Sequence, residues 1–187
     1  MNLAPIAERF GAHRRQRAAE STSMRPLMTL LEQVRDLITL MPTPMYLARP
    51  AARVSGSVGE HVRHCLDHVS SFTAALAGEE LSYDRRLRGT TVEMDPRTAV
   101  NEIERLFTRL ERSAPTPPDH PVTISALVEA RKPPVTMRST VARELAFVVH
   151  HTIHHCALIA LLVEWQGGRV PHGFGVAPST ASARVSS

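Results

Sequence analysis

Lysine is almost absent from this chain of 187 residues, which has 22 basic residues in all and Lys132 as its one lysine. A net charge of +4 and a pI of about 9.8 would ordinarily favour an anionic partner such as nucleic acid. A basic composition built on arginine alone is explained more simply by GC-rich coding than by phosphate binding. The chain also has no helix-turn-helix, zinc-finger or aromatic-platform pattern. We therefore expect no nucleic-acid partner.

Aromatic residues and glycine are scarce too, at 4% and nine residues. This scarcity disfavours a sheet sandwich, whereas the abundant Leu, Ala, Val and Met favour helices. Hydrophobic residues make up 43% of the sequence, enough for the core of one compact domain. We predict an all-α fold.

Only two cysteines are present, Cys65 and Cys156, and both lie within apolar segments of different predicted helices. They fit buried free thiols in a reducing compartment better than a disulfide. We find no signal-peptide stretch at the start of the sequence and no apolar run of membrane-spanning length. These features predict a soluble cytoplasmic protein without a membrane partner.

Apolar residues at helical spacing mark four segments, which predicts a four-helix bundle. The segments are residues 23–41, 57–77, 95–113 and about 140–166. Ser57 and Glu60 form a capping box at the second start, and Asp95 is a suitable N-cap for the third. The β-branched runs within residues 122–140 predict a small hairpin. We place a poorly ordered extension at 1–22, the bundle at 23–168 and a tail that docks on it at 169–187.

Histidines are concentrated in two of these helices, with four in the stretch "HHTIHH" at 150–155. At about 100° per residue, His151 and His155 lie on the apolar side of the last helix, and His150 and His154 lie on the opposite side. Two imidazoles at i and i+4 can bind one divalent ion. We predict that the inward pair does so.

A third ligand can come from the second helix, where His61, His64 and His68 form a stripe at i, i+3 and i+7. Periodicity alone does not choose among the three. The alternative interpretation is that the histidines are polar groups at helix contacts, hydrogen-bonded to one another or to carboxylates such as Asp67 and Glu144.

A metalloprotease is not indicated, because the inward pair lacks the glutamate of the His-Glu-x-x-His motif. We assign the remaining histidines to the surface. They are His13, His120, His150, His154 and His172.

Three stretches resemble the DinB/YfiT-like superfamily: "SVGEHVRHCLDH" (57–68), "YDRRLRGTTVE" (83–93) and "RELAFVVHHTIHHCALIALLVEWQGGRVPHGFGVAPST" (143–180). The resemblance covers about residues 24–180. It implies a cytoplasmic four-helix bundle, commonly a homodimer, in which one histidine of the second helix and a His-x3-His pair of the last helix bind a divalent metal.

Mapped onto this sequence, the family pattern implies His64, His151 and His155 as ligands, with His61 and His68 as alternates. Asp67 follows as the acid of the pattern, and Glu144 is a further candidate partner of the ligands. The implied ion is zinc, nickel or iron, with zinc our first choice. The pattern usually continues with Arg-Gly-Gln after the last histidine, where this chain has Cys-Ala-Leu.

The resemblance implies a metal-dependent hydrolase, or a transferase or isomerase that uses a low-molecular-weight thiol such as bacillithiol or mycothiol on a small-molecule substrate. Arg85, Arg86 and Arg88 of "YDRRLR" would then orient an anionic substrate or the thiol, unless they form a solvated basic loop. The alternative function is a non-enzymatic metal-binding protein for stress response or ligand binding. The segment "FGVAPST" (174–180) either folds over the site or docks elsewhere.

Overall fold

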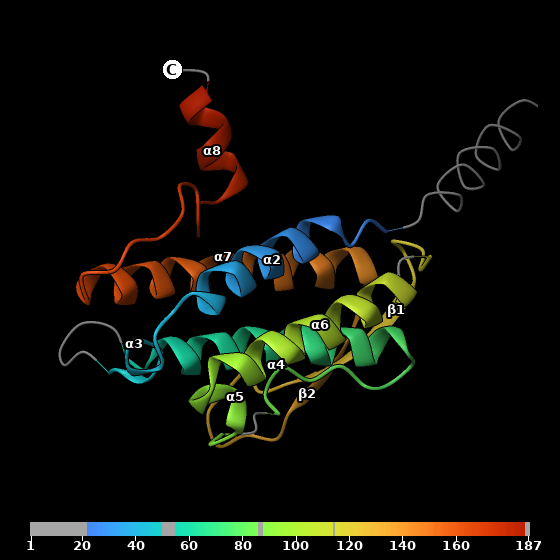
Figure 1. Ribbon diagram of the computed structural model, residues 1–187. Helices are drawn as coiled ribbons and strands as arrows, with labels where there is room; N and C mark the ends of the chain where they lie inside the picture. The colour runs from blue at the N-terminus through green and yellow to red at the C-terminus, as the bar shows by residue number, and fades with distance from the viewer. Residues whose placement is uncertain (1–21, 50–54, 86–87, 114, 186–187) are drawn as a thin grey trace, which may run out of the picture.

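A computed structural model describes residues 22–49, 55–85, 88–113 and 115–185 (Figure 1). The fold is a bundle of four long helices, with α2 and α7 side by side above α4 and α6. Helix α2 packs on α6 and α7, and α4 packs on the same two helices, which closes the ring. The four helices are α2 (Arg25–Thr39), α4 (Val58–Leu76), α6 (Pro96–Ser113) and α7 (Val141–Trp165). The prediction of an all-α four-helix bundle is confirmed.

The helix starts follow the capping residues of the sequence. Ser57 Oγ accepts from the Glu60 backbone N–H at 3.2 Å, and Glu60 Oε2 accepts from the Ser57 N–H at 2.8 Å. Asp95 accepts from the backbone N–H groups of Arg97 and Thr98 at 3.2 and 3.0 Å. These bonds satisfy N–H groups that have no partner inside the helix, so they fix where α4 and α6 begin.

Two short helices between the long ones, α3 (Thr43–Leu47) and α5 (Thr91–Met94), were not predicted. The hydroxyl of buried Tyr46 on α3 donates to the Val92 carbonyl at 2.7 Å. Helix α5 also lies very close to α4 at Gly59, where an added Cβ would be 2.2 Å from the Glu93 carbonyl oxygen. Only a glycine permits this approach, which fixes α5 beside the first turn of α4.

The predicted hairpin is confirmed as β1 (Pro121–Ala126) and β2 (Val135–Thr140), paired antiparallel from Pro121 opposite Thr140 to Ala126 opposite Val135. An isolated bridge joins Leu81, after α4, to Ile124 of β1. Strand β2 leads directly into α7, whose N-cap is Thr140. The hairpin therefore positions the first turn of α7.

Helix α7 corrects one expectation, because by length and composition it is apolar enough to cross a membrane. The core helix of a globular protein meets the same criterion, and α7 packs against both α2 and α4. Its buried residues include Glu144, Thr152 and His155. The expectation that no apolar run reaches membrane-spanning length was therefore wrong for α7.

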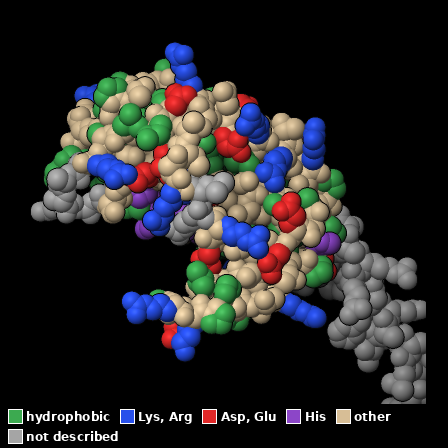
Figure 2. Space-filling model, turned by 90° about the horizontal axis from the view of Figure 1, so that it is seen from below, with side chains coloured by type: hydrophobic (Ala, Val, Ile, Leu, Met, Phe, Trp, Pro, Cys, Tyr) green, Lys and Arg blue, Asp and Glu red, His purple; other side chains and the backbone are tan. Residues whose placement is uncertain are grey.

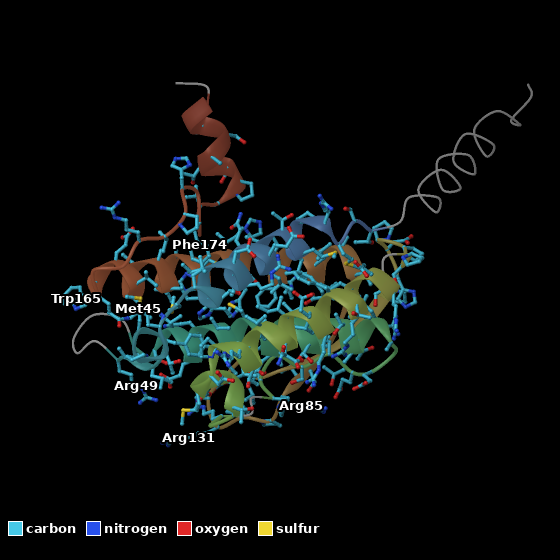
Figure 3. The ribbon with its side chains drawn as sticks, viewed as in Figure 1. Met45, Arg49, Arg85, Arg131, Trp165 and Phe174 are labelled. Atoms are coloured by element: carbon cyan, nitrogen blue, oxygen red, sulfur yellow. The ribbon has the colours of Figure 1, made fainter. Side chains whose placement is uncertain are left out.

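The chain after α7 returns along the bundle before α8 (Pro178–Val185), which stands away from it (Figure 1). Phe174 is buried in the core, and Figure 3 shows it where this segment meets α7. A Cβ at Gly175 would lie 2.7 Å from the backbone nitrogen of Ala157. Residues 173–178 line a groove with α2 and with Val149 and Ile153 of α7. The boundaries at 22/23 and 168/169 stay predictions, and residues 1–21 lie outside the described part of the chain.

Candidate metal centre and adjoining pocket

Five histidines meet where α4 packs against α7. His61, His64 and His68 come from α4, and His151 and His155 come from α7. The spacings i, i+3, i+7 on α4 and i, i+4 on α7 place each set along one face of its helix, and the helix contact brings the two faces together. The stripe and the inward pair of the sequence analysis therefore lie in one cluster.

Two close nitrogen pairs bridge the helices. His64 Nε2 lies 3.1 Å from His151 Nε2, and His61 Nδ1 lies 2.9 Å from His155 Nδ1. In each pair one nitrogen donates and the other accepts, according to the tautomers. Nitrogens that share a tetrahedral zinc ion at 2.0–2.1 Å are about 3.3 Å apart, so these separations are close to those of ligand pairs.

Three of the histidines each offer a ligand nitrogen within 4.8 Å of the other two: His64, His68 and His151. Two of them, His64 and His151, belong also to the predicted set. The third predicted ligand, His155, adjoins the same group, with its ring centroid 4.6 Å from those of His64 and His151. The donor set fits a divalent ion. Both His68 and His155 lie near His64 and His151, so each is a candidate for the third ligand.

Burial favours the neutral imidazole at His61 and His155, and the neutral form is the one that binds metals. Burial, followed by the neighbouring imidazoles of His151 and His61, lowers the pKa of His155 to about 3. Burial is also the main cause that lowers the pKa of His61. His61 Nε2 is buried without a hydrogen-bond partner among the described residues.

His68 is oriented from two sides. Its Nδ1 lies 3.1 Å from the His64 carbonyl oxygen, a contact in which Nδ1–H donates and Nε2 keeps its lone pair. Its ring stacks on that of His151 with centroids 4.0 Å apart and on that of Tyr83 with centroids 4.9 Å apart. Tyr83 therefore forms one wall of the cluster.

Glu144 supports that wall. Its fully buried carboxylate accepts from Tyr83 Oη at 3.1 Å, Ser139 Oγ at 2.6 Å and Arg143 Nη1 at 2.8 Å. Together with burial, which is the larger cause, this carboxylate raises the pKa of Tyr83, so the phenol stays protonated and remains a donor. Glu144 was predicted as a partner of the ligands, and Tyr83 connects it to His68.

Asp67 forms an ion pair with Arg63 one turn earlier on α4, at 2.5 Å. The buried Arg63 also pairs with Glu93 of α5 at 2.5 Å. Glu93 in turn accepts from the Gly89 backbone N–H at 3.2 Å through its other oxygen. This network connects α4 to the segment that leads into α5.

A pocket of about 690 Å³ opens beside the histidines at the start of α4. Its histidines are His61, His64 and His155, and its charged residues are Arg49, Glu60, Arg63, Arg88 and Glu93. Figure 2, seen from below, shows histidine side chains reaching this face near arginine and carboxylate side chains. No residue of the tail at 169–187 lines the pocket among the described residues, so the packing of the tail fits docking elsewhere.

The three arginines of "YDRRLR" have different positions. Arg88 lines the pocket. Arg85 is exposed, pairs with Glu80 at 3.3 Å and does not line it, and Figure 3 shows Arg85 well apart from Arg49. Arg86 lies outside the described residues.

The remaining histidines follow the helical phase. His150 and His154 are exposed, as are His120 and His172, whereas His13 lies outside the described residues. Both cysteines are free and buried, as the sequence analysis expects.

Tyr83, Arg63 and Glu93 were not predicted as site residues from the sequence. The i, i+4 spacing of Arg63 and Asp67 was a readable signal for their ion pair. No local pattern predicts that Tyr83 stacks on His68 or that Glu93 pairs with Arg63. Both contacts depend on how separate segments of the chain pack against α4.

Comparison with known proteins gives a family and one partial relative. The model of the DinB superfamily matches residues 13–159. FK506-binding protein 5 of Rhizopus delemar is 34% identical over 101 residues, which cover 54% of this chain and 26% of that protein. The chain therefore spans about a quarter of the length of this curated relative. The family match extends over most of the chain and includes both histidine-bearing helices, and the chain belongs to the DinB superfamily.

Proposed function

We propose that this protein is a divalent-metal-dependent enzyme that acts on a small molecule bound in the pocket beside the histidines. The observation that carries the proposal is the group of ligand nitrogens from His64, His68 and His151 within 4.8 Å, next to a pocket of about 690 Å³ that is itself lined by His64. A metal site beside an accessible cavity is the usual arrangement of a catalytic centre.

His64 and His151 are the ligands common to both candidate sets. His155 is the third ligand implied by the family pattern, and His68 is the one favoured by mutual distance. Zinc is our first choice, with nickel and iron as alternatives, because imidazole suits all three. An ion held by three of these histidines would supply Lewis acidity to a substrate bound in the adjoining pocket.

Two reactions suit such a site: hydrolysis, and transfer or isomerisation with a low-molecular-weight thiol as cofactor. In either case the chain itself contributes the pocket, the α5 residues that line it and donors that orient the substrate. The Arg63–Glu93 pair and the Gly89 N–H bond to Glu93 hold that wall against α4.

The test begins with metal analysis of protein purified without chelator and without a nickel column. Metal-loaded and stripped protein are then assayed with thiols plus electrophiles, and with simple esters and amides. We expect turnover that requires the metal and is lost in His64→Ala but kept in His150→Ala. Stoichiometric metal without turnover of either substrate class would contradict the enzyme proposal.

A non-enzymatic metal-binding protein is the second candidate, for stress response or ligand sensing. It is favoured by the position of the cluster, since its histidines come from both α4 and α7 and an ion would tie these helices together. This function predicts a large rise in melting temperature with metal and no turnover.

We further propose a cytoplasmic homodimer that binds neither nucleic acid nor membrane. Two buried free thiols support a reducing compartment, and closed twofold dimers are the commonest oligomers of soluble proteins. Light scattering after gel filtration tests the dimer, and fractionation of cells tests the compartment.

A further inference from the structure

We infer that the pocket beside the histidines takes a substrate with a carboxylate group, and that Arg88 binds this carboxylate. The inference rests on the proposed function, because it assigns the substrate class of the same pocket. It starts from the charged side chains that line the cavity.

The two carboxylates of the lining are already engaged at all four oxygens. Glu60 accepts from Arg49 Nη2 at 2.8 Å through Oε1 and from the Ser57 N–H at 2.8 Å through Oε2. Glu93 forms an ion pair with Arg63 through Oε1 and accepts from the Gly89 N–H at 3.2 Å through Oε2. Neither carboxylate is therefore left to hold a cationic substrate.

The arginines of the lining differ in the same respect. Arg49 pairs with Glu60, and Arg63 pairs with both Glu93 and Asp67. Arg88 lines the same cavity, and no ion pair or hydrogen bond of its side chain occurs within the described residues. Its guanidinium is therefore the charged donor of the lining that is available for a ligand.

With a metal bound, the charge around the pocket also favours an anion. The lining has three arginines, Arg49, Arg63 and Arg88, and two carboxylates, Glu60 and Glu93. Asp67, which is not part of the lining, also pairs with Arg63 and balances the third arginine. A divalent ion at the histidines would then make the site positive, and a concave site with an excess of one sign attracts ligands of the opposite sign.

The chemistry of a single guanidinium points to a carboxylate. It presents parallel N–H donors that match the two carboxylate oxygens, and the charges are equal. A phosphate dianion would need further donors, and the other arginines of the lining are already paired.

The exposed Arg88 precedes a backbone contact that ties this segment to α4. The N–H of the next residue, Gly89, donates to Glu93, which is bound to Arg63 one residue before His64. A ligand that spans the cavity would contact Arg88 at one end and the histidines at the other. The contacts of Glu93 with Gly89 and Arg63 connect these two ends. This arrangement orients a substrate whose reactive atom lies away from its carboxylate.

Binding of glutarate, its neutral analogue glutaramide and inorganic phosphate, followed by ligand-observed NMR, tests the inference on the full chain. We expect glutarate to bind wild-type protein, glutaramide to bind at least about tenfold more weakly, and Arg88→Gln to weaken glutarate by about tenfold or more. Arg88→Lys should recover only part of the affinity, because the charge returns without the planar fork. Arg85→Gln is the matched control and should change the dissociation constant less than twofold.

Several results would overturn the inference: no glutarate binding to wild-type protein, equal binding to Arg88→Gln, an equal loss in Arg85→Gln, or tighter binding of phosphate than of glutarate. Metal content is measured in the same samples. Wild-type protein without metal would contradict the proposed function. Unchanged glutarate binding in Arg88→Gln with full metal content would contradict only the carboxylate site.

Discussion

His64 Nε2 and His151 Nε2 lie 3.1 Å apart across the contact between α4 and α7. This pair belongs both to the ligand set implied by the family pattern and to the group of three histidines whose ligand nitrogens lie within 4.8 Å of one another. These two residues are the only members that the two sets share, so they are the first to test as ligands.

The first prediction concerns this pair. His64→Ala or His151→Ala should lower metal affinity by more than about 100-fold, since even changes beyond the ligands themselves cost 10–100-fold. His150→Ala, one residue from His151 but exposed, is the matched control and should keep its metal. Metal analysis after dialysis measures both. Full metal content in His151→Ala would reject the assignment.

The second prediction separates the two candidates for the third ligand. If the three histidines within 4.8 Å bind the ion, His68→Ala should lose metal and His155→Ala should keep most of it, because His68 belongs to that group while His155 pairs with His61. The family pattern predicts the opposite order. Titration of both variants with Zn²⁺ against a chromophoric chelator decides between them, and equal losses would show that both residues bind.

The third prediction concerns acid stability of the metal-free protein. His155 has a folded-state pKa of about 3, below the ordinary value of 6.5, so between these values the unfolded chain binds more protons than the folded one. Stability should be full above about pH 6.5 and should fall as the pH drops towards 3. Urea unfolding at a series of pH values measures this. His155→Gln should show a shallower fall, and an identical profile would contradict the prediction.

The fourth prediction concerns the buried carboxylate behind the cluster. Glu144→Ala leaves the hydroxyls of Tyr83 and Ser139 without their acceptor and should destabilise the fold by about 1–3 kcal/mol. Tyr83→Phe removes one donor and should cost about 1 kcal/mol. Arg143→Ala should have a smaller effect, because that side chain is largely exposed. Denaturant unfolding ranks the three, and the largest loss in Arg143→Ala would contradict this account.

The fifth prediction concerns Gly59. A methyl group there would meet the Glu93 carbonyl oxygen at 2.2 Å and the Tyr46 ring at 2.6 Å, so Gly59→Ala should push α5 away from α4. Overpacking of this kind costs about 1–3 kcal/mol. Thermal unfolding measures the loss of stability. Glu60→Gln, at the next position, is the control, because it removes the ion pair with Arg49 and leaves the space around Gly59 unchanged. An unchanged melting temperature would show that α5 shifts freely.

The sequence predicts the long helices well because their signals are local. Ser57 and Asp95 cap where expected, and the phase of α7 places His151 and His155 toward α4 and leaves His150 and His154 exposed. The predicted hairpin has the same kind of local signal in its β-branched runs. Each of these features depends on residues within a few positions of one another.

The contacts between segments could not be predicted in this way. Nothing near Tyr83 indicates that it stacks on His68, and nothing near Glu93 indicates that α5 packs against Gly59. Periodicity left His61, His64 and His68 equivalent because all three lie on one stripe. Their differences arise only from what α7, Tyr83 and the α5 segment place beside each ring.

Gly175 places the end of the chain against the helix that carries part of the candidate metal centre. It touches the backbone of α7 at Cys156 and Ala157, directly after His155, on a helix whose other side carries the histidines. A larger residue at position 175 would require α7 to move, and the imidazole of His155 would move with it. The size of the residue at position 175 therefore affects the geometry of a site that it does not line.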